Sequence, residues 1–173
     1  MKIKRFKKNP IITPEDVTPY HDGFEVIGAF NAGVVEYKNE ILLLMRIAER
    51  PISKDINIVK VPMVNVQNNE VEIKELDTTN SDYDFTDPRT VRSTDKLEGF
   101  SYLTSISYIR IARSKDGKNF TIDDEPFIYP SNEYEIFGIE DPRCTKIDNT
   151  YYIDFTVVFR QRSSCIFNYN KRF

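Results

Sequence analysis

The residues best suited to chemistry in this sequence are Glu140-Asp141-Pro142-Arg143, which bring two carboxyl groups and a guanidinium within four positions. A proline excludes the α region for the residue before it, so we expect Asp141 to be extended and its carboxyl to be fixed by a stiff backbone. Side chains along an extended chain repeat their direction every two residues, which predicts that Arg143 points to the same side as Asp141. The pair either closes on itself as a surface ion pair at an Asp-Pro turn or binds a polar ligand such as a sugar.

Three further polar residues lie where strands are expected to begin or end. Asn31 either caps the start of a strand or offers its amide to sugar hydroxyls, for which it has both a donor and an acceptor. Arg46 follows an apolar run and either extends to water or faces a polar pocket, since arginine is rarely buried unpaired. Arg113 precedes a predicted turn and is a weaker candidate for the same pocket.

The sequence offers little evidence for other kinds of active site. His21 is the single histidine, no nucleophile elbow accompanies it, and we expect it to lie in a solvated loop. Phosphate-binding glycine loops and metal-ligand clusters are absent from the sequence. Cys144 and Cys165 do not form a CxxC pair, and we expect reduced thiols in a cytoplasmic protein.

Strands must position these residues, because no long window shows helical periodicity and turn signals recur between short apolar runs. Asp116-Gly117 predicts a type I′ hairpin turn, and the surrounding Ser114–Phe120 segment is close to the Asp-box hairpin of sialidase-like propellers, in which Asp116 would be structural. The run 41–47 is apolar on both faces, which predicts an inner strand. Four hairpins are expected, joining 32–37 to 41–47, 61–66 to 70–73, 107–113 to 120–122, and 143–147 to 151–157.

Length and composition limit which classes of protein this chain can belong to. The chain has 173 residues, 29% charged and 40% hydrophobic, which is typical of one globular domain. With 24 Lys and Arg against 27 Asp and Glu, the net charge of −3 argues against a nucleic-acid partner. No apolar run approaches the length of about 18 residues that a membrane span needs, and no signal peptide is indicated, so no membrane partner is expected.

Several of these segments occur in an order that resembles glycoside hydrolase family 130, the β-mannoside phosphorylases and related β-mannosidases. The resemblance covers about residues 5–158, within a predicted domain of residues 1–158, and includes the expected inner strand that ends at Arg46. It is carried by Phe30-Asn31-Ala32-Gly33-Val34, Leu42-Leu43-Leu44-Met45-Arg46, Ile111-Ala112-Arg113-Ser114-Lys115-Asp116-Gly117, and Gly138-Ile139-Glu140-Asp141-Pro142-Arg143 followed by Tyr151-Tyr152-Ile153.

The resemblance implies an all-β chain that forms about the N-terminal half of a five-bladed β-propeller, with the sugar site at the mouth of the central channel. It implies inverting phosphorolysis of a β-mannoside to α-mannose 1-phosphate, with inorganic phosphate as co-substrate, no cofactor, and a homo-oligomer for full-length relatives. Asp141 matches the general acid, which acts through the 3-hydroxyl of the mannosyl group. The matching sugar-binding candidates are Asn31, Arg46, Arg113 and Arg143, and Asp87 in a second Asp-Pro-Arg ranks below Asp141.

The chain also departs from the family pattern. The phosphate-binding positions of the family lie mostly downstream, and residues 159–173 are predicted to be an aberrant tail outside the family fold, as a frame change or truncated reading frame would produce. A half-propeller would expose sheet edges, so we expect a poorly stable and inactive chain. The alternatives are a β-mannosidase that uses water, a non-catalytic carbohydrate-binding module, or a remnant without function.

Overall fold

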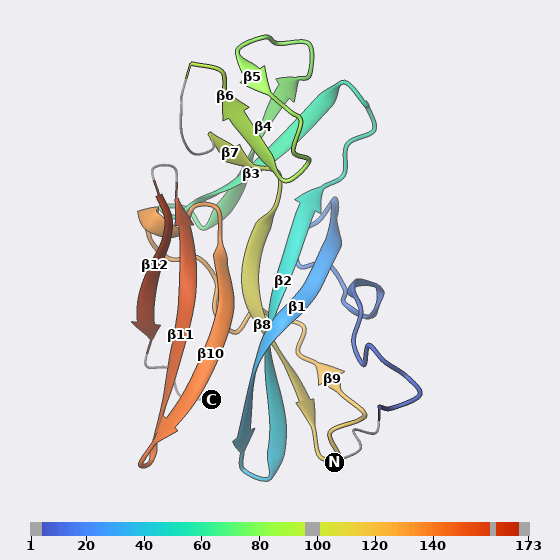
Figure 1. Cartoon of the computed structure of the whole chain (residues 1–173), viewed down its shortest axis with the longest axis vertical. Coiled ribbons are helices and arrows are strands. Elements are labelled where there is room, and N and C mark those ends of the chain that lie inside the picture. The colour runs from blue at the N-terminus through green and yellow to red at the C-terminus, as the bar shows by residue number, and fades with distance from the viewer. Residues whose placement is uncertain (1–4, 96–100, 160–161, 170–173) are drawn as a thin grey trace.

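The computed structural model of the chain describes residues 5–95, 101–159 and 162–169, with side chains described up to Val158, and this part is all-β, as the sequence predicts (Figure 1). Two single-turn 3-10 segments accompany the strands, η1 at Pro14–Asp16 and η2 at Glu133–Glu135. The strands are β1 Phe24–Tyr37, β2 Glu40–Pro51, β3 Ile58–Asn65, β4 Glu70–Asp77, β5 Tyr83–Asp84, β6 Thr90–Ser93, β7 Tyr102–Leu103, β8 Ile106–Ser114, β9 Thr121–Ile122, β10 Ile139–Ile147, β11 Thr150–Phe159 and β12 Arg162–Tyr169.

The largest sheet has the strand order β1-β2-β8-β9, with antiparallel pairing throughout. The predicted inner strand is confirmed: β2 lies between β1 and β8, and its Leu42 and Leu44 are fully buried. The β1–β2 turn has Lys38 and Asn39 at φ of 48° and 65°, the left-handed pair that suits the twist of a tight hairpin.

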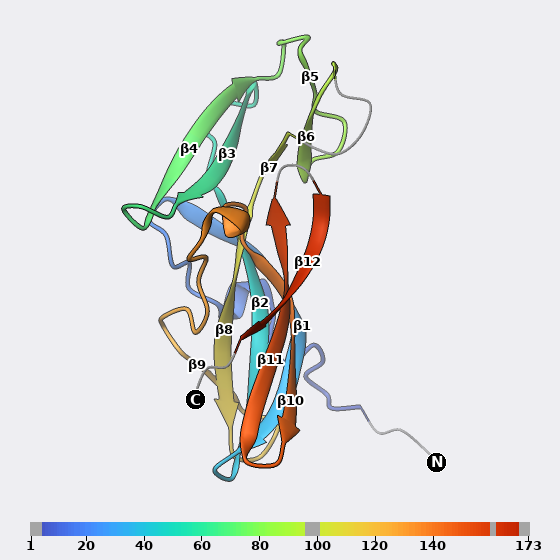
Figure 2. The same cartoon turned by 90° about the vertical axis from the view of Figure 1, so that its left-hand side faces the viewer.

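A second sheet, β10-β11-β12, packs beside the first along most of its length (Figures 1 and 2). The two sheets share one hydrophobic core, to which the first contributes Leu44 and Ile111 and the second contributes Ile139, Ile153 and Val157. Strand β12 pairs with β11 from residue 162 to residue 169, inside the segment predicted to be an aberrant tail. That this segment lies outside the family fold stays a prediction.

Two small sheets, β3-β4 and β5-β6-β7, form the upper part of the molecule in Figure 1. They enclose a separate core that includes Val61, Val91 and Phe137. The β3–β4 hairpin confirms the pairing expected from its two apolar runs. Both small sheets lie at the end of the molecule where β2 stops and β3 begins, so they border one end of the large sheet (Figure 2).

The β8–β9 connection corrects one predicted detail. Only Gly117 has a positive φ, 69°, so the turn is not type I′. The Asp116 carboxylate accepts the backbone N–H groups of Lys118 and Asn119 at 2.9 Å each, and these hydrogen bonds lower the pKa of Asp116. The predicted structural role of Asp116 is therefore confirmed.

The described strands form four sheets and no closed ring, so the five-bladed propeller remains a prediction. Neither helical segment in the described part of the chain has the length and apolar character of a membrane span.

Candidate active site

Asp141 lies at an irregularity of β10, where the pairing with β11 shifts register between Glu140 and Arg143. Its φ is +50°, so the prediction that the following proline holds it extended is wrong. Proline restricts the α region of the residue before it, and the bulge instead places this aspartate in the left-handed region that short polar side chains tolerate. The Asp141 carboxylate is 39% exposed and Oδ1 accepts from Asn31 Nδ2 at 2.8 Å and Arg46 Nη1 at 3.2 Å.

A second bulge, in β1, lies against the bulge of β10 that contains Asp141. The β1–β2 register shifts between Phe30 and Gly33, and Asn31 within this bulge has a φ of 52°. Gly33 lies so close to β10 that an added Cβ would be 2.9 Å from the backbone oxygen of Pro142. Two bulges from different sheets thus meet, and their contact brings the Asn31 amide to the Asp141 carboxylate.

Arg46 links the two acidic residues of the motif. Its Nη2 pairs with Glu140, its Nη1 pairs with Asp141, and its Nε donates to Ser107 Oγ at 3.2 Å. The guanidinium also lies over the Phe30 ring at 4.9 Å from the centroid. Of the two alternatives for Arg46, the structure supports the polar site, because the side chain is only 17% exposed and engages two carboxylates.

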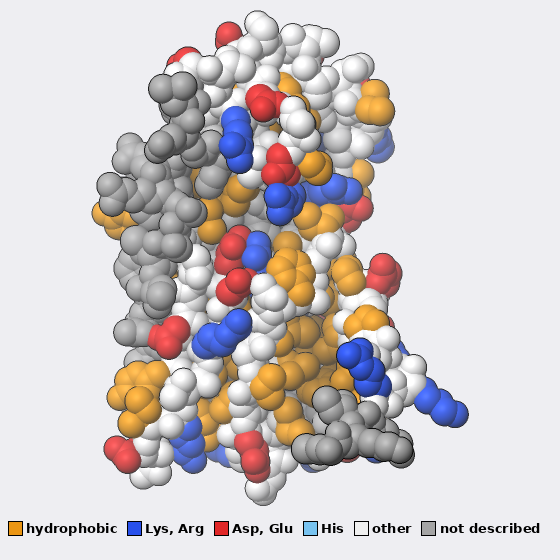
Figure 3. All heavy atoms as spheres, in the orientation of Figure 1, with side chains coloured by type: hydrophobic (Ala, Val, Ile, Leu, Met, Phe, Trp, Pro, Cys, Tyr) orange, Lys and Arg blue, Asp and Glu red, His pale blue; other side chains and the backbone are white. Residues whose placement is uncertain are grey.

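The Glu140 carboxyl is largely buried, and burial raises its pKa. The neighbouring Asp141 charge raises the pKa further, and Arg46 opposes both effects. Charged side chains of both signs gather in the middle of the face in Figure 3, where β10 approaches β1 and β2. The site therefore combines one half-exposed carboxylate, one buried carboxyl, an amide and a guanidinium.

The structure does not bring Arg143 and Arg113 to the Asp141 carboxylate. Arg143 Nη1 donates to the backbone oxygens of Asn31 at 3.3 Å and Pro142 at 2.8 Å, because the bulge breaks the two-residue repeat on which the prediction rested. Arg143 thus braces the two bulges, while its role in sugar binding stays a prediction.

Arg113 pairs with Asp123 at 2.9 Å, and this pair raises the pKa of Arg113. In the pairing of β2 with β8, Arg46 lies opposite Ile109, and Arg113 lies four residues further along β8. At the usual rise of a strand, these four residues separate the two arginines by about 13 Å. Arg113 therefore lies away from Asp141, and its role in sugar binding stays a prediction.

The second Asp-Pro-Arg segment has a different structure. Asp87 closes on its own motif, with Arg89 Nη2 2.9 Å from Oδ2 and the Arg89 backbone N–H 3.0 Å from Oδ1. These hydrogen bonds lower the pKa of Asp87 to about 2. Asp87 thus forms a local ion pair with Arg89, the arrangement that the sequence left open for Asp141 and Arg143, whereas Asp141 pairs with residues far away in the sequence.

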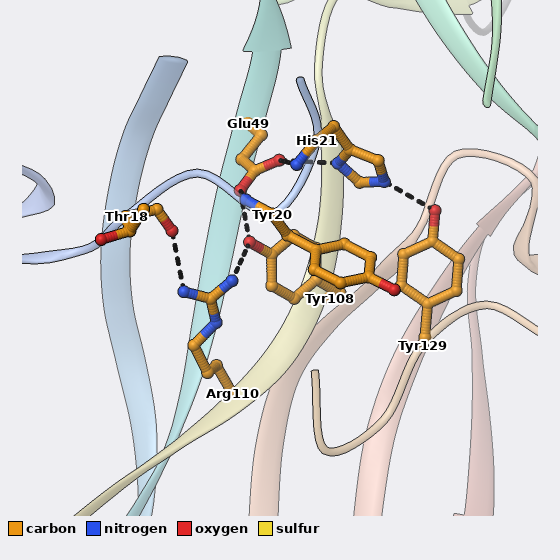
Figure 4. A network of polar contacts seen from close by, with 7 residues as sticks. All are labelled: Thr18, Tyr20, His21, Glu49, Tyr108, Arg110 and Tyr129. Atoms are coloured by element: carbon orange, nitrogen blue, oxygen red, sulfur yellow. Dashed lines mark hydrogen bonds and ion pairs between the residues drawn. The ribbon is translucent and has the colours of Figure 1, made fainter. Parts of the chain in front are cut away.

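The expectation of a solvated His21 is wrong. Its side chain is 13% exposed, Nδ1 lies 2.7 Å from Oε2 of the fully buried Glu49, and Nε2 lies 2.9 Å from the Tyr129 hydroxyl (Figure 4). Oε1 of Glu49 accepts the Tyr20 backbone N–H at 2.6 Å and the Tyr108 hydroxyl. These hydrogen bonds outweigh burial, so the pKa of Glu49 is lowered.

Arg110 extends the same network and joins it to the N-terminal segment. It donates to the Tyr108 hydroxyl at 3.1 Å and to the backbone oxygen of Thr18 at 2.8 Å (Figure 4). Sequence reasoning missed this network. The available signal was Glu49 near the end of an apolar strand, where an unpaired carboxylate would be costly and a partner was therefore required.

The Asp141 site offers hydrogen-bond donors and acceptors but no candidate metal centre. Among the residues that the structure describes, no three His, Cys, Asp or Glu side chains converge to hold a metal ion. A carboxyl flanked by an amide and a guanidinium suits a neutral polyhydroxyl ligand, since each hydroxyl both donates and accepts. The carboxyl could also serve in proton transfer.

Comparison with known proteins gives matches to one family. The model of glycoside hydrolase family 130, described as beta-1,4-mannooligosaccharide phosphorylase, matches residues 100–171, which extend past the boundary predicted at residue 158. A beta-1,2-mannobiose phosphorylase of Listeria innocua is 59% identical over 158 residues, covering 91% of this chain and 44% of that protein. A beta-1,2-mannobiose phosphorylase of a Thermoanaerobacter species is 44% identical over 59 residues, or 34% of this chain and 18% of that protein.

A solved structure gives the same result for the fold. The Listeria innocua beta-1,2-mannobiose phosphorylase in complex with beta-1,2-mannobiose matches with a TM-score of 0.86 at 59% identity, covering 91% of this chain and 45% of that chain. The chain thus spans less than half the length of the curated relatives that it matches. These findings confirm the resemblance carried by the ordered motifs, and over the part that it shares with these relatives this chain is similar to members of glycoside hydrolase family 130.

Proposed function

We propose that this chain provides the mannoside-binding and proton-donating part of a phosphorylase that cleaves β-1,2-linked mannosides. The observation that carries the proposal is the Asp141 carboxylate, held by Asn31 and Arg46 where two bulged strands meet. The relative with 59% identity supports the β-1,2 linkage, since its printed name is beta-1,2-mannobiose phosphorylase. The proposal includes the five-bladed propeller as the architecture of the whole enzyme and the cytoplasm as its compartment.

In the proposed reaction Asp141 acts as the general acid. Its proton passes to the mannosyl 3-hydroxyl, which in turn protonates the glycosidic oxygen as the bond from that oxygen to C1 breaks. An oxygen of inorganic phosphate attacks C1 from the opposite face and forms α-mannose 1-phosphate, while the leaving sugar keeps the proton. Phosphate is already an anionic nucleophile, so the reaction needs neither a cofactor nor a second carboxylate base.

The surroundings of Asp141 suit this role in two ways. Asn31 and Arg46 fix the carboxyl on one side, at Oδ1, so that its exposed part faces a ligand. Glu140, one residue away, is held largely buried, and burial raises the pKa of its carboxyl while Arg46 opposes that rise. A bound mannoside that covers the site would favour the protonated acid, because excluding water penalises the charged carboxylate.

The test is phosphate-dependent cleavage by the full chain. We would incubate it with β-1,2-mannobiose and with β-1,4-mannobiose, each with and without inorganic phosphate, and measure mannose 1-phosphate and mannose. Binding of each sugar is measured in parallel by calorimetry. The variant is Asp141→Asn, and the matched control is Asp148→Asn, the same change at the exposed turn of the same hairpin.

Because the resemblance places the phosphate-binding positions mostly downstream of this chain, we expect it to bind β-1,2-mannobiose with little turnover. Asp141→Asn should weaken this binding about tenfold, the effect of one lost charged hydrogen bond, and the control should bind unchanged. Any mannose 1-phosphate that forms should fall at least about 100-fold in Asp141→Asn, as is usual for a lost general acid. Phosphate-independent release of mannose would instead identify a mannosidase. Sugar binding without turnover, unaffected by Asp141→Asn, would identify a carbohydrate-binding module. A chain that neither binds nor cleaves either sugar would contradict the proposal for this chain.

A further inference from the structure

A hollow lies beyond the end of β2, the strand that carries Arg46. It is a cavity of about 360 Å³, here called the upper cavity, between the end of β2, the start of β3 and the small β5-β6-β7 sheet. Side chains from sequence-distant segments meet there, including Glu25, Arg50, Lys60, Phe85 and Asp87. We propose that the upper cavity binds a further sugar unit of a β-mannoside chain whose scissile end lies at Asp141, an inference that rests on the function proposed above.

The position of the cavity relative to Asp141 follows from strand β2. Arg46, which contacts Asp141, and Arg50, which lines the cavity, are four residues apart on this strand. Residues separated by an even number along a strand share a face, and four residues span about 13 Å. Figure 3 shows two gatherings of acidic and basic side chains on this face, one above the other, with the surface recessed between them. A short oligosaccharide would reach from one to the other.

The charges around the cavity suit a neutral ligand. Two acidic residues, Glu25 and Asp87, face two basic ones, Arg50 and Lys60, so neither an anion nor a cation is favoured by net charge. Glu25 and Arg50 pair with each other at 2.7 Å, and each side chain remains about half exposed, at 47% and 48%. A carboxylate with free lone pairs beside a guanidinium with free N–H groups matches the alternating acceptors and donors of sugar hydroxyls.

An apolar platform completes the site. Phe85, partly buried, packs against the hydrophobic core of the upper sheets and makes an edge contact with Tyr83 at 6.2 Å between ring centroids. Pro51 and Pro88 line the same cavity. A few polar groups around an apolar floor, in a volume near the lower end of the usual range of about 300–1,000 Å³, are typical of a small-ligand site. The C–H face of a sugar ring would lie on this floor.

The walls of the cavity are fixed before any ligand binds. Asp87 is held by Arg89, and the Thr104 hydroxyl donates to the backbone oxygen of Pro88 at 2.7 Å. On the opposite wall the Ser53 hydroxyl donates to the backbone oxygen of Ile58 at 3.0 Å. A preformed site loses little conformational entropy on binding, which favours a weakly interacting ligand such as a sugar.

The test compares two sugars of different length on the full chain. Calorimetry measures the affinity of β-1,2-mannobiose, which fits at Asp141 alone, and of β-1,2-mannotetraose, which would also reach the upper cavity. The variants are Arg50→Ala and Phe85→Ala. Lys54→Ala is the matched control, since it removes a cation from the neighbouring loop without touching the cavity lining. Circular dichroism confirms that each variant is folded.

We expect the unmodified chain to bind the tetraose more tightly than the biose. Arg50→Ala should lower tetraose affinity about tenfold, the effect of one lost hydrogen bond from a charged donor, and leave biose affinity and the control unchanged. If Phe85→Ala fails to fold, Arg50→Ala alone decides the result. Equal affinities for both sugars, or an equal loss for both in Arg50→Ala, would overturn the proposed subsite and leave the proposed function standing. Failure of the unmodified chain to bind either sugar would overturn both.

Discussion

The buried Glu49 carboxylate makes the sharpest stability prediction. Its two oxygens accept four hydrogen bonds: from the backbone N–H groups of Tyr20 and His21, from the His21 ring and from the Tyr108 hydroxyl. In Glu49→Gln one oxygen becomes an NH2 group, which can donate either to the His21 ring or to the Tyr108 hydroxyl oxygen, depending on the orientation of the amide. The other three donors then face either a neutral oxygen or no acceptor at all.

The magnitude follows from these three donors. Each loses about 1 kcal/mol when a charged acceptor is replaced by a neutral one or removed, which predicts a destabilisation of about 3 kcal/mol. For a chain of 173 residues this corresponds to a melting temperature lower by about 9 °C. Thermal unfolding followed by circular dichroism measures it. Glu25→Gln is the matched control on the same hairpin: its partner Arg50 is as close, but the pair is half exposed and contributes less than about 1 kcal/mol.

The same network gives a pH dependence with a defined sign. Folding lowers the pKa of Glu49 from 4.5, the value in the unfolded chain. The ionised carboxylate therefore stabilises the fold fully above pH 4.5, and this stabilisation is lost as the pH falls through the lower pKa of the folded chain. The stability difference between the unmodified chain and Glu49→Gln should therefore be constant near neutral pH and shrink below pH 4.5. A loss in Glu49→Gln no larger than in Glu25→Gln, or a difference that grows on acidification, would refute the reasoning.

Two further predictions concern positions that shape the site and the β8–β9 turn. Gly33→Ala places a Cβ 2.9 Å from the Pro142 backbone oxygen, so it should push the two bulges apart and destabilise the chain by about 1–3 kcal/mol. Mannobiose binding measured by calorimetry should weaken, and unchanged binding would show that this contact does not position Asp141. Asp116→Ala removes the acceptor of two backbone N–H groups, so proteolysis within 115–119 should become faster, while equal cleavage rates would argue against its structural role.

Local sequence signals determined the all-β class and the main hairpins. Asp148 at the β10–β11 turn and Asn39 at the β1–β2 turn adopt the left-handed conformation that such turns require, and each signal acts within a few residues. The inner position of β2 followed from the apolar character of both its faces. The order of the motifs likewise sufficed to indicate the family, without any knowledge of how the strands pair across the molecule.

The geometry of the site was decided by contacts between distant segments. Asn31 and Asp141 are separated by 110 positions, and only the meeting of two bulges puts Asp141 in a left-handed conformation that the following proline alone would not predict. His21 looked solvated because its partner Glu49 lies 28 positions away, on a strand that reads as apolar. A turn is fixed by neighbouring residues, whereas a buried carboxylate meets its hydrogen-bond donors only when the packing of whole sheets brings them together and removes water.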